Sequence, residues 1–390
     1  MKTNDKSTFV SIVVPALNEQ LTIGEFVDWC REGLRKAGVD GEILIIDSST
    51  DQTAEIAEQH GAKVIKVPRR GLGQAYIDAI PYIKGNYVIV GDCDLTYDFR
   101  EIKFFIDKMD EGYEFVMGTR LKWSIEKGAM PALHRYFGIP LTTFIFNRIY
   151  GSQYSDIHCG MRAITLNALR RLNLESGSWE YASEMVLKAV KMELRSAEVP
   201  IKFYKDRVGR VSHHKRIGWF SPWMAGWSNV RVMFLYSPDF FLMVPGFILI
   251  LLGLLINLAV LSGYNNVGPM QLSVHSMLFG VISIVAGYSA IQMGILSKVI
   301  YDFSPDTSSK YKKIFSYNHG VIAGCILILL GLLSQAHFVY GFIRDKFILY
   351  EMSKISIIGL LLLLLGFQTF TFTLVFNMVI HRKEANKDKL

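Results

Sequence analysis

Short apolar runs alternate with amphipathic segments over the first 238 residues of the chain. The apolar runs predict strands at residues 10–14, 42–47, 62–67, 87–92 and 114–119. Helical periodicity predicts helices between them at residues 22–34, 50–60 and 73–83. Continuous apolar strands joined by helices are typical of a parallel sheet that is covered on both faces. We therefore expect a doubly wound, mostly parallel α/β sheet, whose first helix opens with a capping box of Thr22 and Glu25.

The rest of the chain is dominated by long apolar stretches. No Asp, Glu, Lys or Arg occurs in residues 240–297, 314–343 or 355–380. A membrane span needs roughly 20 apolar residues, so the first stretch is long enough for two spans, with the polar segment "GYNNVGPMQ" as its turn. The predicted transmembrane helices cover about residues 240–262, 272–297, 319–343 and 355–380. A composition that is 51% hydrophobic agrees with a membrane protein.

Basic residues in the loops predict the orientation of these helices. Lys and Arg are frequent in the 298–313 connection and after residue 380, and absent from the 263–271 loop. The 344–354 loop holds three basic residues, so the bias is weaker for the second hairpin. The positive-inside rule places the long N-terminal part, the 298–313 connection and the C-terminus in the cytoplasm.

We divide the chain on this basis into four parts. They are a cytosolic domain at 1–215, an interfacial amphipathic helix at 216–238, four transmembrane helices at 239–380 and a basic tail at 381–390. Three Trp residues spaced by four in 219–227 favour a helix that lies in the headgroup region. Residues 202–216 hold six Lys or Arg against one Asp. Beside a membrane span, such a segment favours anionic lipid or a phosphorylated lipid over nucleic acid.

Polar residues follow four of the predicted strands. The motifs are "PALNE" at 15–19, "DSSTD" at 47–51, "PRRGLGQA" at 68–75 and "DCD" at 92–94. In parallel sheets ligands bind outside the carboxyl ends of the strands, so we expect a binding site at this edge. Asp92 and Asp94 would repel each other, and Mg²⁺ or Mn²⁺ with substrate phosphate oxygens would remove that cost. The alternative interpretation is that these carboxylates only cap a helix and form surface ion pairs. It is less favoured here, because the two acids follow a central strand of the sheet.

The segment "GLGQAY" at 71–76 is not a dinucleotide-binding fingerprint. It lacks the third Gly, and it does not follow the first strand. Two interpretations stay open for Gly73 and Gln74: a close approach of the chain to a bound nucleotide or sugar, and a plain turn.

Six segments together resemble the family 2 glycosyltransferases of the GT-A type. In order along the chain they are "VSIVVPALNE", "IIDSSTDQTAEIA", "GDCDLTYD", "VMGTR", "HCGMRAI" and "EYASEMV". The resemblance is to the polyprenyl-phosphate branch, which includes dolichyl-phosphate mannose and glucose synthases and their bacterial relatives. It covers residues 8–238, and a membrane-anchored C-terminus suits the same branch.

The resemblance implies roles for residues at the matching positions. Donor binding is implied for Pro15, Ala16, Asn18, Glu19, Asp47, Asp51, Asp92, Cys93 and Asp94. A Mg²⁺ or Mn²⁺ ion is implied on Asp92 and Asp94, and Arg120 is implied as a catalytic residue beside them. Phosphate contacts are implied for Arg120, Arg135 and Arg162, and we add Arg207 and Arg210 because they lie in the basic segment before the first span. Thr96 occupies the position where Gln is frequent in dolichyl-phosphate mannose synthases, so the resemblance does not favour mannose over other hexoses as the transferred sugar.

The expected activity is that of an inverting glycosyltransferase that moves a hexose from a nucleotide-diphosphate sugar to a polyprenyl phosphate. UDP- or GDP-hexose and dolichyl or undecaprenyl phosphate all fit, and the membrane helices allow a homo-oligomer. A processive polysaccharide synthase is the first alternative, but residues 120–238 contain no QxxRW-type motif. A catalytically silent membrane scaffold or transport subunit is the second, and the intact acid pair argues against it.

Overall fold

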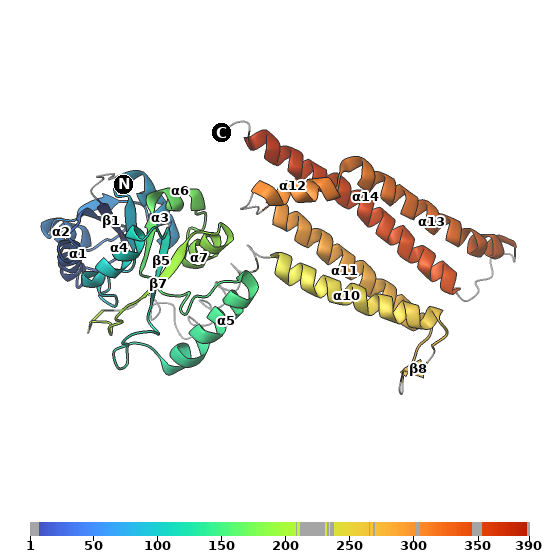
Figure 1. Cartoon of the computed structure of the whole chain (residues 1–390), viewed down its shortest axis with the longest axis horizontal. Coiled ribbons are helices and arrows are strands. Elements are labelled where there is room, and N and C mark those ends of the chain that lie inside the picture. The colour runs from blue at the N-terminus through green and yellow to red at the C-terminus, as the bar shows by residue number, and fades with distance from the viewer. Residues whose placement is uncertain are drawn as a thin grey trace. The chain divides into compact units, whose positions relative to one another are not determined.

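The computed structural model divides the chain into two compact units, Met1–Met233 and Phe234–Leu390, here called the sheet unit and the helical unit (Figure 1). The structure describes residues 8–207, 209–210, 231, 234, 238–264, 266–267, 270–300, 305–344 and 353–387. The interfacial helix predicted over 216–238 therefore lies almost entirely outside the described residues, and it stays a prediction.

The sheet unit is built on a seven-stranded sheet with the strand order β3-β2-β1-β4-β6-β5-β7. The strands are β1 (Phe9–Ala16), β2 (Asp40–Asp47), β3 (Lys63–Lys66), β4 (Tyr87–Val90), β5 (Phe115–Thr119), β6 (Arg162–Thr165) and β7 (Ser196–Pro200). Only β6 runs antiparallel to its neighbours β4 and β5. The five predicted strands and the mostly parallel sheet are confirmed. Strands β6 and β7 were not predicted; β7, at the sheet edge, ends in Pro, a residue that is rare inside sheets.

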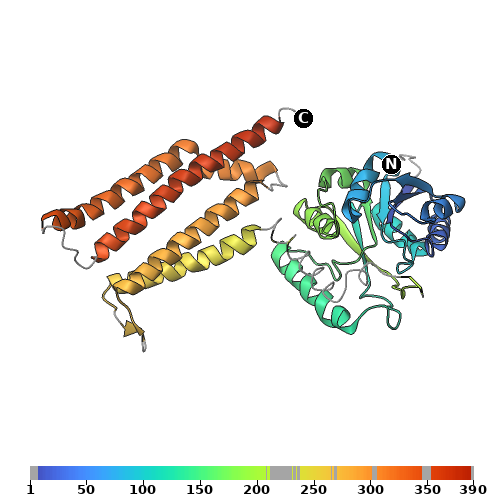
Figure 2. The ribbon, with the colours of Figure 1, turned by 180° about the vertical axis from the view of Figure 1, so that it is seen from behind.

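Helices cover both faces of this sheet (Figures 1 and 2). They are α1 (Ile23–Ala37), α2 (Thr53–Gln59), α3 (Leu72–Ala79), α4 (Lys103–Asp110), α5 (Ile139–Tyr150), α6 (Leu166–Leu172) and α7 (Tyr181–Lys191), with a π-helical turn at His134–Gly138 before α5. Helix α1 packs on α2 and α4, whereas α3 packs on α7. This division of the helices between the two faces follows from right-handed crossovers. The chain runs from β1 to β3 in one direction along the sheet and then returns to β4, so the helix in the returning connection, α3, lies on the opposite face from α1 and α2.

The capping box predicted at the start of α1 is not formed. Thr22 is the N-cap as expected, but its side chain makes no capping hydrogen bond. Its hydroxyl donates instead to the Glu19 carbonyl at 3.3 Å, and Glu25 pairs with Arg207. A long-range ion pair has therefore replaced the local contact that the sequence pattern predicted.

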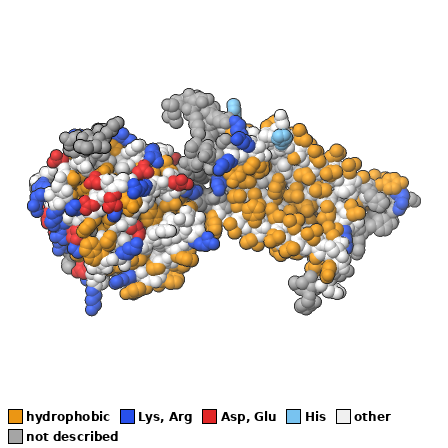
Figure 3. Space-filling model, viewed as in Figure 1, with side chains coloured by type: hydrophobic (Ala, Val, Ile, Leu, Met, Phe, Trp, Pro, Cys, Tyr) orange, Lys and Arg blue, Asp and Glu red, His pale blue; other side chains and the backbone are white. Residues whose placement is uncertain are grey.

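Among the described residues of the helical unit, four helices are long and apolar enough to cross a membrane. The bounds are α10 (Pro238–Leu261), α11 (Val274–Ile300), α13 (Tyr317–Arg344) and α14 (Lys354–Lys387), each within a few residues of the prediction except at the longer end of α14. A further helix, α12 (Pro305–Ile314), lies in a connection for which no element was predicted. Hydrophobic side chains cover the visible face of this unit, whereas charged side chains are interspersed over the sheet unit (Figure 3).

Two helical hairpins, α10–α11 and α13–α14, repeat one packing pattern. Residues 246–255 and 324–333 are identical except at Phe247 and Cys325. The facing glycine pairs are Gly246 with Gly287, Gly253 with Gly280, Gly324 with Gly366 and Gly331 with Gly359. A Cβ added to the first glycine of each pair would lie 2.4–3.0 Å from the carbonyl oxygen of the second. Small residues allow membrane helices to approach closely, so the helical unit is a duplicated glycine-packed hairpin.

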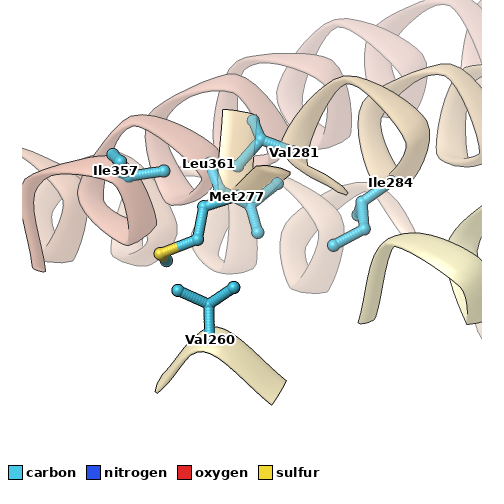
Figure 4. Packing of buried hydrophobic residues seen from close by; sticks show 6 residues of the cluster. All are labelled: Val260, Met277, Val281, Ile284, Ile357 and Leu361. Carbon is cyan, nitrogen blue, oxygen red and sulfur yellow. The ribbon is translucent and has the colours of Figure 1, made fainter. Parts of the chain in front are cut away.

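The two hairpins meet through their second helices, α11 and α14. A buried cluster from α10, α11 and α14 joins them, formed by Val260, Met277, Val281, Ile284, Ile357 and Leu361 (Figure 4). Further along the same interface the Gln368 amide donates to the Ser289 hydroxyl at 2.7 Å. Apolar packing and interhelical hydrogen bonds of this kind hold helices together where burial from water gives no driving force.

Candidate active site

The loops after β1 and β2 are tied together at one edge of the sheet. The backbone N–H of Asn18 donates to the Ser49 hydroxyl at 2.8 Å, and the Thr50 N–H donates to Asn18 Oδ1 at 2.9 Å. Asn18 has φ +56°, a left-handed conformation that Asn tolerates better than most residues. The sheet therefore brings "PALNE", including Pro15 and Ala16 at the end of β1, beside "DSSTD" as predicted.

Two carboxylates shape the loop after β2. Asp47, the last residue of the strand, is buried and accepts a hydrogen bond from the Ser49 N–H at 3.1 Å. Asp51 accepts from the Thr53 N–H at 3.0 Å at the start of α2. Both lie at the predicted edge, and each accepts a hydrogen bond that fixes the backbone two residues further along the loop.

The acid pair follows β4 at the centre of the sheet. Asp94 Oδ1 accepts from the Thr96 N–H at 3.0 Å and from the Thr96 hydroxyl at 2.5 Å. Among the described residues, the Asp92 carboxylate has no hydrogen-bond partner. Burial, and then the Asp94 charge, raise the pKa of Asp92 to about 7. Burial also raises the pKa of Asp94, and Arg210 opposes that shift.

These properties fit a divalent cation. Two partly desolvated carboxylates one residue apart carry an excess of negative charge that a cation offsets. No cluster of three or more His, Cys, Asp and Glu ligands occurs among the described residues. A metal ion held here would therefore take its remaining ligands from substrate phosphate oxygens and water, as Mg²⁺ does in other phosphate sites.

The neighbouring predicted donor residues make internal contacts. Cys93 is buried, and its thiol lies 3.5 Å from the Pro15 carbonyl, which joins the acid loop to β1. A Cβ at Gly73 would lie 2.0 Å from the Ser176 carbonyl oxygen, and the Gln74 N–H donates to the Gly177 carbonyl. The close approach that Gly73 permits is therefore to the 176–178 backbone.

Arg120 and Arg162 were expected to approach phosphates, but the structure places both in the interior. Arg120 Nε and Nη2 donate to the two oxygens of Asp156 at 2.7 and 2.9 Å, and Asp156 is fully buried. Arg162 is 1% exposed and donates to the backbone carbonyls of Cys159 and Ala182. Both side chains hold the 156–160 loop, which passes beside Asp92 at Gly160.

The remaining predicted arginines have three different environments. Arg135, in the π-helical turn, lies with its guanidinium 5.3 Å from the centre of the Tyr136 ring. Arg207 is exposed and pairs with Glu25. The Arg210 side chain is 9% exposed and reaches the acid pair, with Nη1 at 3.4 Å from Asp94 Oδ2.

Two buried acids were missed or left undecided by sequence reasoning. Asp156 received no role, although it lies two residues before the quoted "HCGMRAI" segment, and it is the buried partner of Arg120. Glu184 lies in the quoted "EYASEMV" segment, where the sequence is compatible both with a sugar contact and with a structural role. Its carboxylate accepts the N–H groups of Glu175 and Ser176 and pairs with Lys188, so it fixes the loop before α7.

Comparison with known proteins identifies the family. Residues 11–172 match Glycosyl transferase family 2, and residues 301–380 match the Glycosyltransferase family 2 C-terminal transmembrane region. Over 370 residues the chain is 31% identical to the Low-salt glycan biosynthesis hexosyltransferase Agl6 of Haloferax volcanii, which covers 94% of this chain and 87% of that protein. The chain belongs to glycosyltransferase family 2. This family 2 glycosyltransferase has the GT-A-type sheet and is a multi-pass membrane protein.

Other relatives of this glycosyltransferase match mainly its sheet unit. The Dolichyl-phosphate hexose transferase of Haloferax volcanii is 30% identical over 207 residues, which cover 52% of this chain and 85% of that protein. The Undecaprenyl-phosphate 4-deoxy-4-formamido-L-arabinose transferase of Edwardsiella ictaluri is 28% identical over 213 residues, with coverages of 53% and 63%. Among solved structures, glucosyl-3-phosphoglycerate synthase from Mycobacterium tuberculosis with Mn²⁺ and UDP has a TM-score of 0.46 at 21% identity, with coverages of 58% and 79%.

Proposed function

We propose that this glycosyltransferase transfers a hexose from a UDP- or GDP-hexose to a polyprenyl phosphate at the cytosolic face of the membrane. The observation that carries the proposal is the desolvated Asp92–Asp94 pair at the ligand-binding edge of the sheet, in a chain with membrane helices. Similarity to a hexosyltransferase over 94% of the chain and to two polyprenyl-phosphate transferases over the sheet unit supports the same class of donor and acceptor.

The donor would bind across the loops after β1, β2 and β4. In this proposal Asp92 and Asp94 hold Mg²⁺ or Mn²⁺, and Asn18, Asp47 and Asp51 line the side of the nucleoside. The metal ion supplies Lewis-acid stabilisation of the leaving diphosphate. Arg120 and Arg162 act by fixing the loop at Gly160, which keeps Asp92 in place.

The acceptor would approach along the π-helical turn and α5. Large apolar side chains are exposed there: Leu133, Tyr136, Phe137 and Phe144 are 60–72% exposed. Apolar side chains next to a basic residue are typical of a surface that enters the headgroup region. We propose that this surface contacts the bilayer and that Arg135 and Arg207 bind the lipid phosphate, since Arg makes bidentate phosphate contacts.

The reaction is a single displacement in this proposal. An oxygen of the lipid phosphate attacks the anomeric carbon, the bond from that carbon to the diphosphate oxygen breaks, and the nucleoside diphosphate leaves with the electron pair. The second pKa of a phosphate monoester is about 6, so the acceptor is already largely ionised near pH 7. Positioning and charge stabilisation therefore matter more than a strong base, and one in-line displacement inverts the anomeric centre.

The test is a screen of UDP- and GDP-hexoses against dolichyl and undecaprenyl phosphate, with mass analysis of the lipid product. We expect one hexose per lipid, and loss of transfer in chelator and in Asp92→Asn and Asp94→Asn. Asp107→Asn is the matched control, because Asp107 is an exposed acid that pairs with Lys103 on α4. A polymeric product would favour a processive synthase. Absence of both transfer and donor hydrolysis would favour a scaffold, and full activity in chelator would contradict metal dependence.

A second set of variants tests the acceptor site. Arg135→Ala and Arg207→Ala should each weaken the apparent affinity for lipid phosphate by about 10- to 150-fold, which corresponds to about 1.5–3 kcal/mol for a charge-assisted contact. Donor affinity should stay nearly unchanged. Lys127→Ala, at an exposed position ahead of the π-helical turn, serves as the control. A collapse of donor affinity with normal lipid dependence would show that the acceptor assignment is wrong.

A further inference from the structure

Arg210 is surrounded by carboxylates at the candidate metal site. Its Nε and Nη2 donate to the two oxygens of Glu19 at 2.7 and 2.6 Å, and its Nη1 donates to Asp206 at 2.9 Å. The same Nη1 lies 3.4 Å from Asp94 Oδ2. Glu19 is itself buried, so this is an enclosed charge cluster rather than a surface ion pair.

The segment that carries Arg210 lies across the acid loop. We call residues 203–207 and 209–210 the strap. The Tyr204 N–H donates to the Thr96 carbonyl at 2.9 Å, and the Tyr204 hydroxyl donates to Asp98 at 3.0 Å. The Lys205 N–H donates to Glu126 at 2.8 Å. The strap is therefore attached to the 94–98 loop through its backbone as well as through the Arg210 side chain.

Arg210 and a metal ion would compete for the same negative charge. A divalent cation bound to Asp94 lies about 2 Å from a carboxylate oxygen. With Nη1 at 3.4 Å from that carboxylate, the two cations would be a few Å apart in a partly buried site, where their repulsion exceeds thermal energy even at an effective dielectric of about 20. Arg210 is the group that offsets the charge of Asp94 and Glu19 in the structure described here.

We propose that Arg210 is the resting counter-cation of the donor site. Its guanidinium holds Asp94 and Glu19 when no donor is bound, and binding of the metal–nucleotide complex displaces it from Asp94 and loosens the strap. This inference rests on the proposed metal-dependent function, because it assumes that a metal ion binds at Asp92 and Asp94. It assigns to Arg210 a role in positioning the strap rather than contact with the lipid phosphate.

The test measures metal binding in the full-length protein in detergent, without any acceptor. Mn²⁺ affinity is obtained from the electron paramagnetic resonance signal of free Mn²⁺, for the wild type, Arg210→Met and Lys205→Met. Lys205 is an exposed basic residue on the same strap, so its variant is a matched control for the loss of one charge. We expect Arg210→Met to bind Mn²⁺ on the order of tenfold more tightly, and Lys205→Met to change the affinity less than about twofold.

Amide hydrogen exchange separates displacement from a purely electrostatic effect. Addition of Mn²⁺ with UDP or GDP should speed exchange of the Tyr204 amide in the wild type. In Arg210→Met that amide should exchange fast before any metal is added. Arg210→Lys, which keeps the charge but not the forked geometry, should show an intermediate Mn²⁺ affinity and covers the case that the Met variant does not fold.

Several results would overturn the proposal. Equal Mn²⁺ affinity in the wild type and the Arg210 variants, or slower exchange of Tyr204 on metal binding, would exclude displacement. Weaker UDP or GDP binding with unchanged Mn²⁺ affinity would show that Arg210 is instead a ligand of the donor phosphate. Hexose transfer with these results would leave the proposed function intact, whereas no Mn²⁺ binding in any of the proteins would contradict both proposals.

Discussion

Replacing Arg120 by Met removes one half of a buried ion pair and keeps most of the length of the side chain. Asp156 is fully buried, and both of its oxygens accept hydrogen bonds from the Arg120 guanidinium. Burial by itself would raise the pKa of Asp156, but the neighbouring Arg120 outweighs it and holds that pKa below its usual range. In Arg120→Met the sheet unit must therefore bury an unpaired carboxylate or protonate it.

The expected loss in the free energy of unfolding is large. Removing one partner of a buried pair destabilises a protein by about 3–5 kcal/mol. For a domain of 150–250 residues, each kcal/mol lowers the melting temperature by about 2–4 °C, so the melting temperature should fall by roughly 6–20 °C. The double variant Arg120→Met/Asp156→Leu leaves no unpaired charge, and it should lose clearly less than the sum of the two single variants.

The distribution of cysteines supplies the assay. Cys30, Cys93 and Cys159 are buried in the sheet unit, whereas Cys325 is exposed in the helical unit. In a Cys325→Ser background, a thiol-reactive dye therefore reports unfolding of the sheet unit during heating in detergent. All variants are compared in this background.

Two results would refute the reasoning. If the double variant is destabilised by the sum of the single effects, the coupling energy between Arg120 and Asp156 is close to zero, and an unpaired buried charge is not the cause of the destabilisation. If Arg120→Met keeps the wild-type melting temperature but loses transfer at saturating donor and acceptor, Arg120 acts on the substrate and not through Asp156.

Three further predictions follow from other parts of the structure. Burial lowers the pKa of His158 to about 4, against about 6.5 in the unfolded chain, so only the unfolded state gains a proton between these values. The free energy of unfolding of the sheet unit should therefore fall as the pH drops from 6.5 towards 4, by about 2 kcal/mol between pH 6.5 and 5. His158→Gln should remove most of this pH dependence in the thiol assay. An unchanged pH dependence would contradict the role given to His158. Gly253→Leu and Gly331→Leu should each open one hairpin, because a Cβ alone would lie 2.4 and 2.9 Å, respectively, from a facing carbonyl oxygen. The yield of folded protein should therefore be lower for both variants. Gly341→Leu is the control, because nothing lies near a Cβ added at Gly341. Single-cysteine labelling from outside the cell should reach Asn266 and miss Ser308 and Asn386, and labelling of Ser308 in intact cells would overturn the cytosolic assignment.

The features that depend on local pattern could be predicted from the amino-acid sequence. Continuous apolar strands and the helices between them predicted the parallel part of the sheet, because side-chain periodicity is a property of neighbouring residues. The position of Asp92 and Asp94 at the edge formed by the carboxyl ends of the parallel strands followed from the ends of those strands. The four spans followed from uncharged stretches, since a bilayer excludes charge along a whole helix.

Which charged groups meet became visible only in the folded chain. Arg120 pairs with Asp156, 36 residues away, and Arg210 pairs with Glu19, 191 residues away. Nothing in the residues around an arginine distinguishes one that binds a phosphate from one that holds a loop, because the partner is supplied by another part of the chain. The glycine-packed hairpins show the same limit: a repeated spacing of seven residues is visible in the sequence, but the facing glycine is chosen by how two helices cross.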